Sequence, residues 1–545
     1  MSKTLLNGAW RMRETGGKGR VRQWIAARVP GCVHTDLLRA KKIPDPYYRR
    51  NELDVLWVDQ ASWEYVRSFR ATAAQSRAAM QQLVFEGLDT AATVYLNGRK
   101  VGSADNMFRR WRFDVAGRLR EGENELRVVF ESPIKYGRRM KDKSTSVCNR
   151  LEERAWPDRP PRPVFRPFIR KAQCHFGWDW GPALSTSGIW QDCYLLATDE
   201  PVLDYVTTQQ KHGAKGVTLS VAADVLAPKA GAGTLEVRIG GQTVRVAAKL
   251  KKGTNRVAAK VTITKPKLWW PVGAGSQPLY DLAVTWTPDG RTKASDRYET
   301  EIGLRKVELV QEKDAIGRSF KLRVNGRDLY CKGANWIPDD VFADRTTPGR
   351  LKRLVEDTVA GNMNMLRLWG GGIYAQDELL RLCDRMGVMV WHDFMFACAA
   401  YPEDKWFLDS VEAEMRHQIR RMGNHPSIVL WCGNNENQTA VDSWWAEDPN
   451  QKRFRQAYDK LTYDTQERVV RDEDPARPWI PSSPTGCPRK PGYPFGAANE
   501  GDMHYWEVWH RRKNFDNYLT VKPRFSSEFG FQSFPSIETL QTVAR

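Results

Sequence analysis

The sequence predicts a multidomain protein: a jelly-roll β-sandwich, then an immunoglobulin-like β-sandwich, then a (β/α)8 TIM barrel. The chain has 545 residues, enough for three or four domains of roughly 100–200 residues each. Short β-branched and aromatic runs separated by turn residues fill roughly the first 300 positions. After about Gly303, apolar strand patterns alternate with helical ones, which indicates a parallel sheet with helical connections. We expect domains at 1–200, 201–303 and 304–545.

The first domain is predicted from short strand-like runs at 83–86, 93–96 and 125–130. Asn97-Gly98 directly follows the second run and is the residue pair that a type I′ hairpin turn prefers. No long helical period is apparent in this part of the chain. A jelly-roll sandwich is a common way to bury such strands.

The second domain is predicted from its length of about 100 residues and from short strands at hairpin spacing. Gly240-Gly241 marks one of its turns. The Cys…Trp…Cys signature of antibody domains is missing, so the immunoglobulin-like assignment rests on length and rhythm alone.

The barrel is predicted from seven apolar runs in the last part of the chain. A helix between the third and fourth runs has Val411, Met415, Ile419 and Met422 at helical spacing, and residues 424–426 (Asn-His-Pro) end it. Roughly 240 residues follow Gly303, close to the minimum for a barrel, and the eighth strand is not found. We therefore expect the sequence to stop after strand 7, before the barrel closes. The seven runs are 330–336, 363–369, 388–394, 428–433, 479–483, 502–506 and 524–529.

The composition excludes several classes of protein. Hydrophobic residues make up 41% and charged residues 27% of the chain, as in ordinary globular proteins. The mean hydropathy is −0.58 and no apolar run reaches the ~20 residues of a membrane helix, so a spanning protein is excluded. The first ten residues lack the apolar core of a secretion signal. We expect a cytoplasmic protein, or a periplasmic or secreted one if a leader was removed.

The cysteine and charge patterns do not predict a zinc protein or a nucleic-acid binder. Nine cysteines are scattered without zinc spacing, which favours reduced thiols. The net charge of +19 raises nucleic acid as a partner, but the basic residues are interleaved with acids and carry no nucleic-acid motif. The basic, proline-rich segment 150–171 is interpreted as a solvated loop. We expect no nucleic-acid or membrane partner; the oligomeric state stays open, a homodimer included.

The chemistry is expected at the carboxyl ends of the barrel strands, where TIM-barrel enzymes build their sites. Glu436 and Glu528 end strands 4 and 7, which lie on opposite sides of an eight-strand ring. Two carboxylates ~5–5.5 Å apart are what retaining glycoside hydrolysis requires. The chain also has 22 tryptophans, and indole faces stack on sugar rings. The alternative for either glutamate is an ordinary ion pair.

Several segments give the chain a family resemblance. It resembles the family 2 glycoside hydrolases, and among them the β-mannosidase type, over essentially its whole length. The Phe-Gly-Trp-Asp-Trp-Gly-Pro and Cys-Gly-Asn-Asn-Glu-Asn segments together are specific to that branch. The matching segments are 29–38, 176–182, 369–374, 394–398, 431–437 and 527–535.

The resemblance implies roles for individual residues. Glu436 would be the acid/base, Glu528 the nucleophile, and Asn435 would hold the sugar 2-hydroxyl, which is axial in mannose. Asp179 and Trp178 would reach from the first sandwich into the barrel mouth. The remaining implied positions are Asp393 and Trp369 lining the sugar pocket, Trp444 flanking it, and His504 or Tyr505 beside the nucleophile, a choice that the sequence leaves open. The alternatives are core packing for the three tryptophans and a turn cap for Asp179.

The resemblance also implies parts that this sequence does not contain, namely an eighth strand and further β-sandwich domains. Arg511 and Arg512 stand where small residues are common in the family, so the outer subsites are expected to differ. No metal or organic cofactor is expected, because side chains supply both the nucleophile and the proton donor.

The function predicted from the sequence is a retaining exo-β-mannosidase that removes terminal non-reducing β-D-mannose by double displacement. One alternative keeps the mechanism and changes the sugar, as in a β-galactosidase or β-glucuronidase. Another is a non-catalytic carbohydrate-binding fragment whose barrel does not close.

Overall fold

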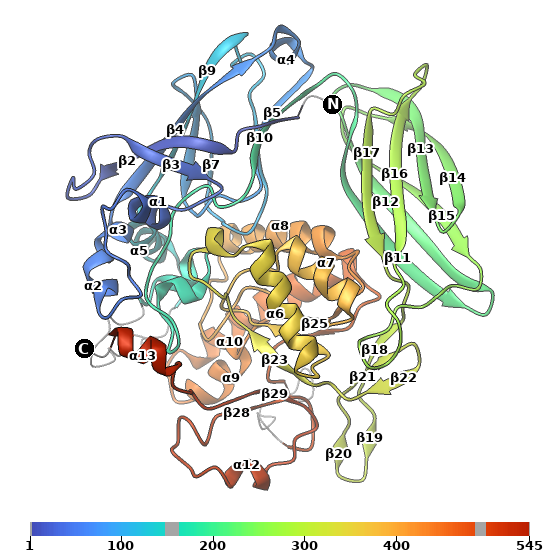
Figure 1. Cartoon of the computed structure of the whole chain (residues 1–545). Coiled ribbons are helices and arrows are strands. Elements are labelled where there is room, and N and C mark those ends of the chain that lie inside the picture. The colour runs from blue at the N-terminus through green and yellow to red at the C-terminus, as the bar shows by residue number, and fades with distance from the viewer. Residues whose placement is uncertain (1–2, 148–162, 486–497, 544–545) are drawn as a thin grey trace.

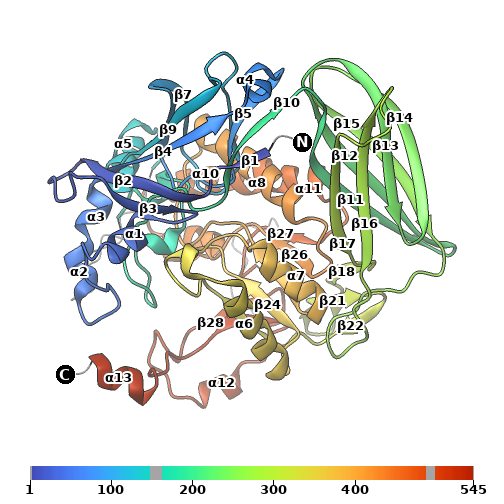
Figure 2. The same cartoon turned by 45° about the horizontal axis from the view of Figure 1, so that its top comes forward.

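The computed structural model describes residues 3–147, 163–485 and 498–543. Two β-domains, blue and green in Figure 1, stand beside a mixed α/β part coloured yellow to red. The green domain lies next to α7, α8 and α11 in the second view as well (Figure 2). Among the described helices, none is long and apolar enough to cross a membrane. The seven described cysteines are all free.

The first domain consists of two antiparallel sheets, ordered β3-β2-β4-β9-β6-β7 and β1-β10-β5-β8. Trp63, Phe85 and Phe130 are fully buried in its core. The predicted Asn97-Gly98 turn is confirmed, with φ of 50° and 77°. The strands are β1 (Lys3–Leu5), β2 (Gly8–Gly16), β3 (Ile25–Val29), β4 (Ser62–Ala71), β5 (Met80–Phe85), β6 (Ala92–Leu96), β7 (Arg99–Ala104), β8 (Trp111–Asp114), β9 (Gly122–Phe130) and β10 (Cys193–Thr198).

This domain also contains helices that the strand rhythm did not predict. The longest of those described is α5 (Pro133–Lys143), which begins with a capping contact: Ser132 Oγ accepts the N–H of Lys135, and Pro133 occupies the first turn. The N-cap serine and the proline of the first turn are both present in the sequence, but the helix that they begin has only three turns. The shorter helices are α1 (Val33–Arg39), α2 (Asn51–Val55), α3 (Trp57–Gln60) and α4 (Ala73–Arg77).

The second domain is another sandwich of two antiparallel sheets, ordered β11-β12-β15 and β14-β13-β16-β17. Gly240 and Gly241, with φ of 56° and 76°, form the predicted turn between β13 and β14. Trp286 lies fully buried in its core. The strands are β11 (Val202–Gly213), β12 (Gly216–Ala227), β13 (Gly231–Ile239), β14 (Gln242–Leu250), β15 (Gly253–Ile263), β16 (Tyr280–Pro288) and β17 (Asp296–Ile302).

Short antiparallel strands connect this sandwich to the α/β part. Asn325 and Gly326 form the turn between β21 and β22, as their sequence predicts. Phe320 and Leu322 pack under the parallel strands that follow. The strands are β18 (Val307–Val310), β19 (Lys313–Asp314), β20 (Gly317–Arg318), β21 (Lys321–Val324) and β22 (Arg327–Leu329).

Each of the seven predicted barrel runs contains a parallel strand of the described chain. The order is β23-β24-β25-β26-β27 in one sheet and β28-β29 in another. Near-continuous apolar runs are typical of parallel strands that are buried on both faces. The strands are β23 (Gly333–Trp336), β24 (Met365–Leu368), β25 (Met389–Asp393), β26 (Ile428–Cys432), β27 (Trp479–Ile480), β28 (Met503–Tyr505) and β29 (Ser526–Phe529).

Helices alternate with these strands. The predicted amphipathic helix is α8 (Lys405–Met422), and Val411, Met415, Ile419 and Met422 are all buried. An insertion of helical turns between β26 and β27 carries Trp444. The other helices are α6 (Pro348–Ala360), α7 (Asp377–Met386), α9 (Asn437–Thr439), α10 (Gln451–Asp459), α11 (Arg468–Glu473), α12 (Asn517–Thr520) and α13 (Ile537–Val543).

Side chains link the two parallel sheets at their carboxyl ends. Ser483 Oγ, after β27, donates to Asp502 Oδ2 before β28 at 2.6 Å. On the other side, Asn335 Nδ2 of β23 donates to the carbonyl of Ser527 in β29 at 3.1 Å. The strand ends therefore surround one common mouth.

The interpretation of segment 150–171 as a solvated loop is wrong for the part that the structure describes. Arg166, Arg170 and Lys171 are all buried, and residues 148–162 lie outside the described chain. Arg170 Nη2 pairs with Glu414 Oε1 of α8 at 2.6 Å, and Lys171 Nζ pairs with Asp89. These cations are needed inside because they satisfy carboxylates and carbonyls at the junction between the first domain and the α/β part.

Candidate active site

A cavity of about 830 Å³ opens at the carboxyl ends of the parallel strands. Its walls combine aromatic rings with carboxylate, amide and imidazole groups, the mixture that a sugar site requires. Eight of the ten residues predicted for the site line it: Trp178, Asp179, Trp369, Asn435, Glu436, Trp444, His504 and Glu528.

The two predicted carboxylates face the same space. Glu436 follows β26 and Glu528 lies in β29, and an oxygen of each lies with a ring nitrogen of His504 inside one 4.8 Å group. His504 Nδ1 is 2.8 Å from Glu436 Oε1 and 3.0 Å from Glu528 Oε2. The geometry therefore brings both acids within reach of one small ligand.

The backbone of Glu436 is strained. Its φ is 60°, in the left-handed region that a residue with a β-carbon seldom occupies. Its N–H donates to the carbonyl of Ser483 at 2.8 Å, which ties the strained residue to the end of β27. Strain of this kind, of order 1–3 kcal/mol, persists where surrounding contacts enforce it, commonly at functional sites.

His504 carries a positive charge between the two acids. Burial alone would lower the pKa of its imidazole, but the negative charge of Glu528 and the hydrogen bonds to Glu528 and Glu436 raise it to about 9. Its other nitrogen, Nε2, lies 2.9 Å from Ser483 Oγ. The ring is held in place from both sides.

Glu528 is held in its ionised form. Burial opposes the charge, but His504, Arg367 and a hydrogen bond from Trp506 Nε1 bring the pKa of this carboxyl well below its usual value. Arg367 Nη1 lies 3.0 Å from Oε1 and Trp506 Nε1 lies 3.0 Å from Oε2. Both oxygens therefore have donors.

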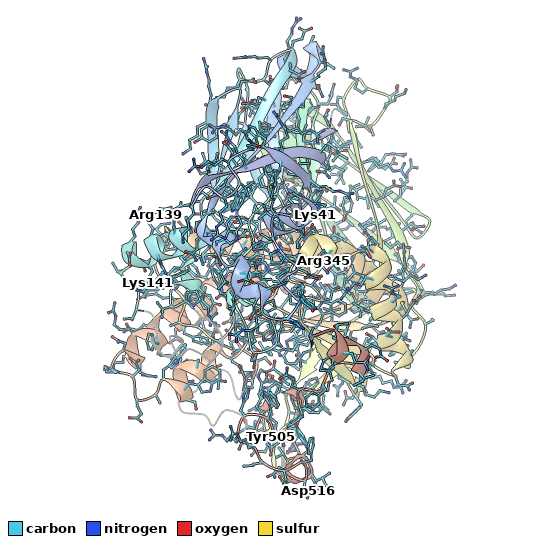
Figure 3. All side chains as sticks on the ribbon, turned by 60° about the vertical axis from the view of Figure 1, so that its left-hand side comes forward. Lys41, Arg139, Lys141, Arg345, Tyr505 and Asp516 are labelled. Carbon is cyan, nitrogen blue, oxygen red and sulfur yellow. The ribbon has the colours of Figure 1, made fainter. Side chains whose placement is uncertain are left out.

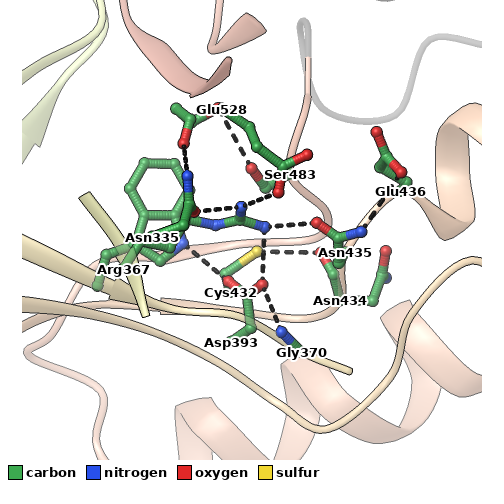
Figure 4. A network of polar contacts seen from close by, with 12 residues as sticks. Asn335, Arg367, Gly370, Asp393, Cys432, Asn434, Asn435, Glu436, Ser483 and Glu528 are labelled. Carbon is green, nitrogen blue, oxygen red and sulfur yellow. Dashed lines mark hydrogen bonds and ion pairs between the residues drawn. The ribbon is translucent and has the colours of Figure 1, made fainter. Parts of the chain in front are cut away.

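Arg367 lies at the centre of the polar network in Figure 4. Its Nη1, which contacts Glu528, also donates to Asn335 Oδ1 at 2.9 Å. Its Nη2 donates to Asp393 Oδ2 and to Asn435 Oδ1, both at 2.8 Å. The amide of Asn435 is thereby fixed, with Nδ2 3.4 Å from Glu436 Oε2.

Two predicted residues do not line the cavity. Asp393 is fully buried below Arg367, where it also accepts the N–H of Gly370 at 3.0 Å. Burial raises the pKa of Asp393, and Arg367 opposes that shift. Tyr505 points toward α12, where its hydroxyl donates to the carbonyl of Asn517 at 3.3 Å, and Figure 3 shows it near Asp516. His504, and not Tyr505, is therefore the residue that lies beside Glu528.

The first sandwich contributes an aromatic wall to the cavity. Trp178 and Trp180 both meet Trp369 edge to face, with ring centroids 4.7 and 5.6 Å apart. Trp178 and Trp369 are buried in the hydrophobic core as well as lining the cavity, so each combines packing with a pocket wall. Asp179, which stands between Trp178 and Trp180 in the sequence, also lines the cavity, as does Trp444, which is 47% exposed.

Sequence reasoning missed several residues of this site. Arg367 and Trp506 contact Glu528 directly, and Trp180 and Cys398 line the cavity. The strand-end rule that selects the glutamates also selects Arg367 and Trp506, but it assigns neither of them a contact with Glu528. Arg511 also lines the cavity.

The group formed by Glu436, His504 and Glu528 is also the one in the described chain whose atoms are close enough to bind one metal ion. The acidic neighbours of His504 raise the pKa of its imidazole to about 9, so the ring is protonated at neutral pH. The imidazolium itself supplies the positive charge between the carboxylates.

Comparison with known proteins identifies the family. A family model described as "Glycosyl hydrolase 2 galactose-binding domain-like" matches residues 10–191. A second model, described as "Glycosyl hydrolases family 2", matches residues 202–305. A β-mannosidase of Bos taurus is 38% identical over 99% of this chain and 62% of its own length. A β-mannosidase B of Aspergillus flavus is 35% identical over 98% of this chain and 63% of its own.

A solved structure gives the same result. The β-D-mannosidase of Dictyoglomus thermophilum superposes with a TM-score of 0.90 at 38% identity, covering 100% of this chain and 64% of that one. The chain therefore spans about three fifths of the length of the relatives it matches.

Proposed function

Because this chain belongs to glycoside hydrolase family 2, we propose that it acts as a retaining exo-β-mannosidase on terminal, non-reducing β-D-mannose. The observation that carries the proposal is the pair of carboxylates, Glu436 and Glu528, gathered within one 4.8 Å group at the cavity floor. Retaining glycosidases use two carboxyl groups this close together, one as nucleophile and one as acid/base.

Glu528 is the nucleophile of the proposed reaction. The pKa of its carboxyl is held below the usual value, so it is ionised and able to attack the anomeric carbon. Attack forms a bond from a Glu528 oxygen to that carbon while Glu436 gives its proton to the departing glycosidic oxygen. Glu436 then takes a proton from water, the water oxygen attacks the same carbon, and Glu528 is released.

Asn435 and the first sandwich would select the sugar. Arg367 holds Asn435 Oδ1, which leaves Nδ2 turned toward Glu436 and the place of the 2-hydroxyl. Asp179 and Trp178 line the pocket from the first sandwich, which supports removal of a terminal residue. The relatives named above as β-mannosidases support mannose as the sugar.

We also propose that the seven parallel strands belong to a (β/α)8 barrel whose two preceding domains are jelly-roll and immunoglobulin-like sandwiches. The strands follow one another around the mouth in chain order. In the described chain, Ser483 and Asp502 link β27 to β28 through their side chains, and β23 and β29, at the two ends of the row, each pair with a single neighbour. An eighth strand between them would complete the ring.

The experiment compares hydrolysis of aryl β-mannoside, β-galactoside and β-glucuronide side by side. Mannoside should be preferred, because its 2-hydroxyl is axial; preference for another sugar would support a β-galactosidase or β-glucuronidase instead. Sugar binding without any turnover would favour a non-catalytic binding protein.

The nucleophile is tested by trapping. A 2-fluoro mannosyl fluoride should leave a mannosyl adduct on Glu528, and Glu528→Gln should lose turnover by on the order of 10³-fold or more. An adduct on another residue, or near-normal turnover of the variant, would overturn the assignment.

A further inference from the structure

A segment between β25 and α8, residues 394–398, lies directly against the acid/base position. The N–H of Asn435 donates to the carbonyl of Phe396 at 2.9 Å, and the N–H of Cys398 donates to the carbonyl of Asn435 at 3.0 Å. The segment thus extends the parallel sheet by one step beside the backbone of Asn435 and Glu436.

Cys398 at the end of this segment contacts Glu436 through its side chain. Its thiol donates to Glu436 Oε2 at 3.3 Å and accepts from Asn435 Nδ2 at 3.4 Å. The φ of Cys398 is 48°, so this residue, like Glu436, adopts the left-handed backbone conformation. Two strained residues in contact at a cavity wall indicate that the surroundings enforce both conformations.

Arg166 supplies the enforcing contact on Cys398. This buried arginine belongs to the first domain, where it begins the short 3-10 turn Arg166–Phe168. Its Nη2 donates to the carbonyl of Cys398 at 2.8 Å and its Nη1 to that of Ala397 at 3.2 Å. Hydrogen bonds from a charged donor are about twice as strong as neutral ones, so the guanidinium fixes this turn firmly.

A second arginine and a tryptophan extend the same support. Arg170 Nη1 donates to the carbonyl of Met395 at 3.0 Å, so the two arginines satisfy three carbonyls of one segment. The Arg166 guanidinium also lies over the ring of Trp178, 5.4 Å from its centroid. One side chain of the first domain therefore touches both the segment that supports the acid/base and the aromatic wall of the pocket.

We infer that Arg166 and Cys398 are positioning residues for the acid/base: Arg166 fixes the backbone of Cys398, and the Cys398 thiol orients the Glu436 carboxylate toward the leaving-group oxygen. The inference rests on the proposed function, because it assigns these two residues to the proton-transfer step of that reaction. It makes the first domain part of that step and not only of sugar binding.

The test measures leaving-group dependence. Cys398→Ala should lower kcat/KM by about 10- to 100-fold on an alkyl β-mannoside, whose leaving group needs a proton, and by less than about threefold on a dinitrophenyl β-mannoside, which needs none. Cys398→Ser keeps a hydroxyl donor and should recover most of the loss. Equal losses on both substrates, or no rescue by serine, would overturn the inference.

Two further variants separate positioning from folding. Arg166→Lys keeps the charge but not both carbonyl contacts, and it should show the same selective loss on the alkyl substrate. Cys383→Ala removes a buried thiol of α7 away from the cavity, and it should leave the ratio between the two substrates unchanged. A selective loss in the Cys383 variant, or none in the Arg166 variant, would contradict the inference.

A second measurement does not require turnover. The Glu436 carboxylate should disfavour the reactive thiolate of Cys398, so Glu436→Gln should speed alkylation of Cys398 by iodoacetamide about 3- to 10-fold, followed by mass spectrometry of that peptide. If the native protein hydrolyses no mannoside, the proposed function fails and this measurement alone decides whether Cys398 and Glu436 interact. An unchanged alkylation rate would refute the contact.

Discussion

Arg367 balances the charges of the candidate site. It contacts two carboxylates, Glu528 and Asp393, and two amides, Asn335 and Asn435, from one buried guanidinium. The planar fork of arginine suits such a set of acceptors, and the single ammonium of lysine does not. The positions of Glu528 and Asn435 therefore depend on one side chain.

We expect Arg367→Lys to lower kcat/KM for an activated aryl β-mannoside by on the order of 10²-fold or more, because Glu528 and Asn435 lose their fixed positions. Arg367→Gln should be worse and should also destabilise the fold, since it leaves Asp393 buried without a cation. Steady-state kinetics with thermal unfolding as a control measures both effects. A lysine variant with normal kinetics would show that charge alone suffices.

A pH dependence of stability follows from His504. The pKa of its imidazole rises from an ordinary value of 6.5 to about 9 on folding, so the stabilisation is complete below about pH 6.5 and is lost as the pH rises toward 9. The unfolding midpoint should fall over that range, and His504→Gln should flatten the fall. A fall of equal size in the variant would assign it to other groups.

The sequence located most of the candidate cavity but not the orientation of each side chain. Neighbouring residues on a strand point to opposite faces, so only one of His504 and Tyr505 can face the mouth. The pairing of β28 with β29 shifts register between Met503 and His504, and nothing in the local sequence signals that shift. The catalytic and sugar-binding roles stay predictions until the variants are measured.

At the scale of elements, the strands were predictable and the short helices were not. Each barrel run is continuously apolar, and the structure has a strand inside each predicted range, shortened to as little as Trp479–Ile480. Helices α1 to α4 have seven residues or fewer, too short to establish a periodicity. The buried arginines of segment 163–171 could not be predicted either, because their partners lie more than 200 positions away.

Glu414, a buried carboxylate of helix α8, is one of the groups that join this helix to the first domain. Glu414 accepts from Arg170 Nε and Nη2, from Asn106 Nδ2 at 2.8 Å and from Tyr374 Oη at 2.7 Å. Removing one partner of a buried ion pair strands the other charge, at a cost of about 3–5 kcal/mol.

Glu414→Gln should therefore lower the unfolding midpoint clearly, because Arg170 loses its counter-charge. The double variant Glu414→Leu with Arg170→Met should lose less free energy of unfolding than Glu414→Leu and Arg170→Met lose together as single variants. A double-mutant cycle of urea unfolding measures the difference. Additive losses would mean that the two residues act independently across the junction.

At the scale of the whole molecule, the net charge of +19 has a structural use. Arg166, Arg170 and Lys171 are buried at the junction of the first domain, and exposed cations also meet acids. Arg139 bonds Glu131, and Arg345 lies 2.9 Å from Asp340. Figure 3 shows Arg139 and Arg345 at separate places in the same view.

The cavity belongs to two domains at once, and Asp179 tests that arrangement. It lines the cavity from the first sandwich, and its two neighbours in sequence, Trp178 and Trp180, pack on Trp369 of the α/β part. A carboxylate that bonds sugar hydroxyls contributes about 1.5–3 kcal/mol, so Asp179→Ala should lower kcat/KM for an aryl β-mannoside by about 10- to 100-fold. Asp179→Asn keeps the shape and should lose less. Trp444→Ala, at a half-exposed ring that lines the cavity, should matter mainly for longer oligosaccharides. If Asp179→Ala kept full activity, the first sandwich would not take part in holding the terminal sugar, and the turn-cap alternative would stand.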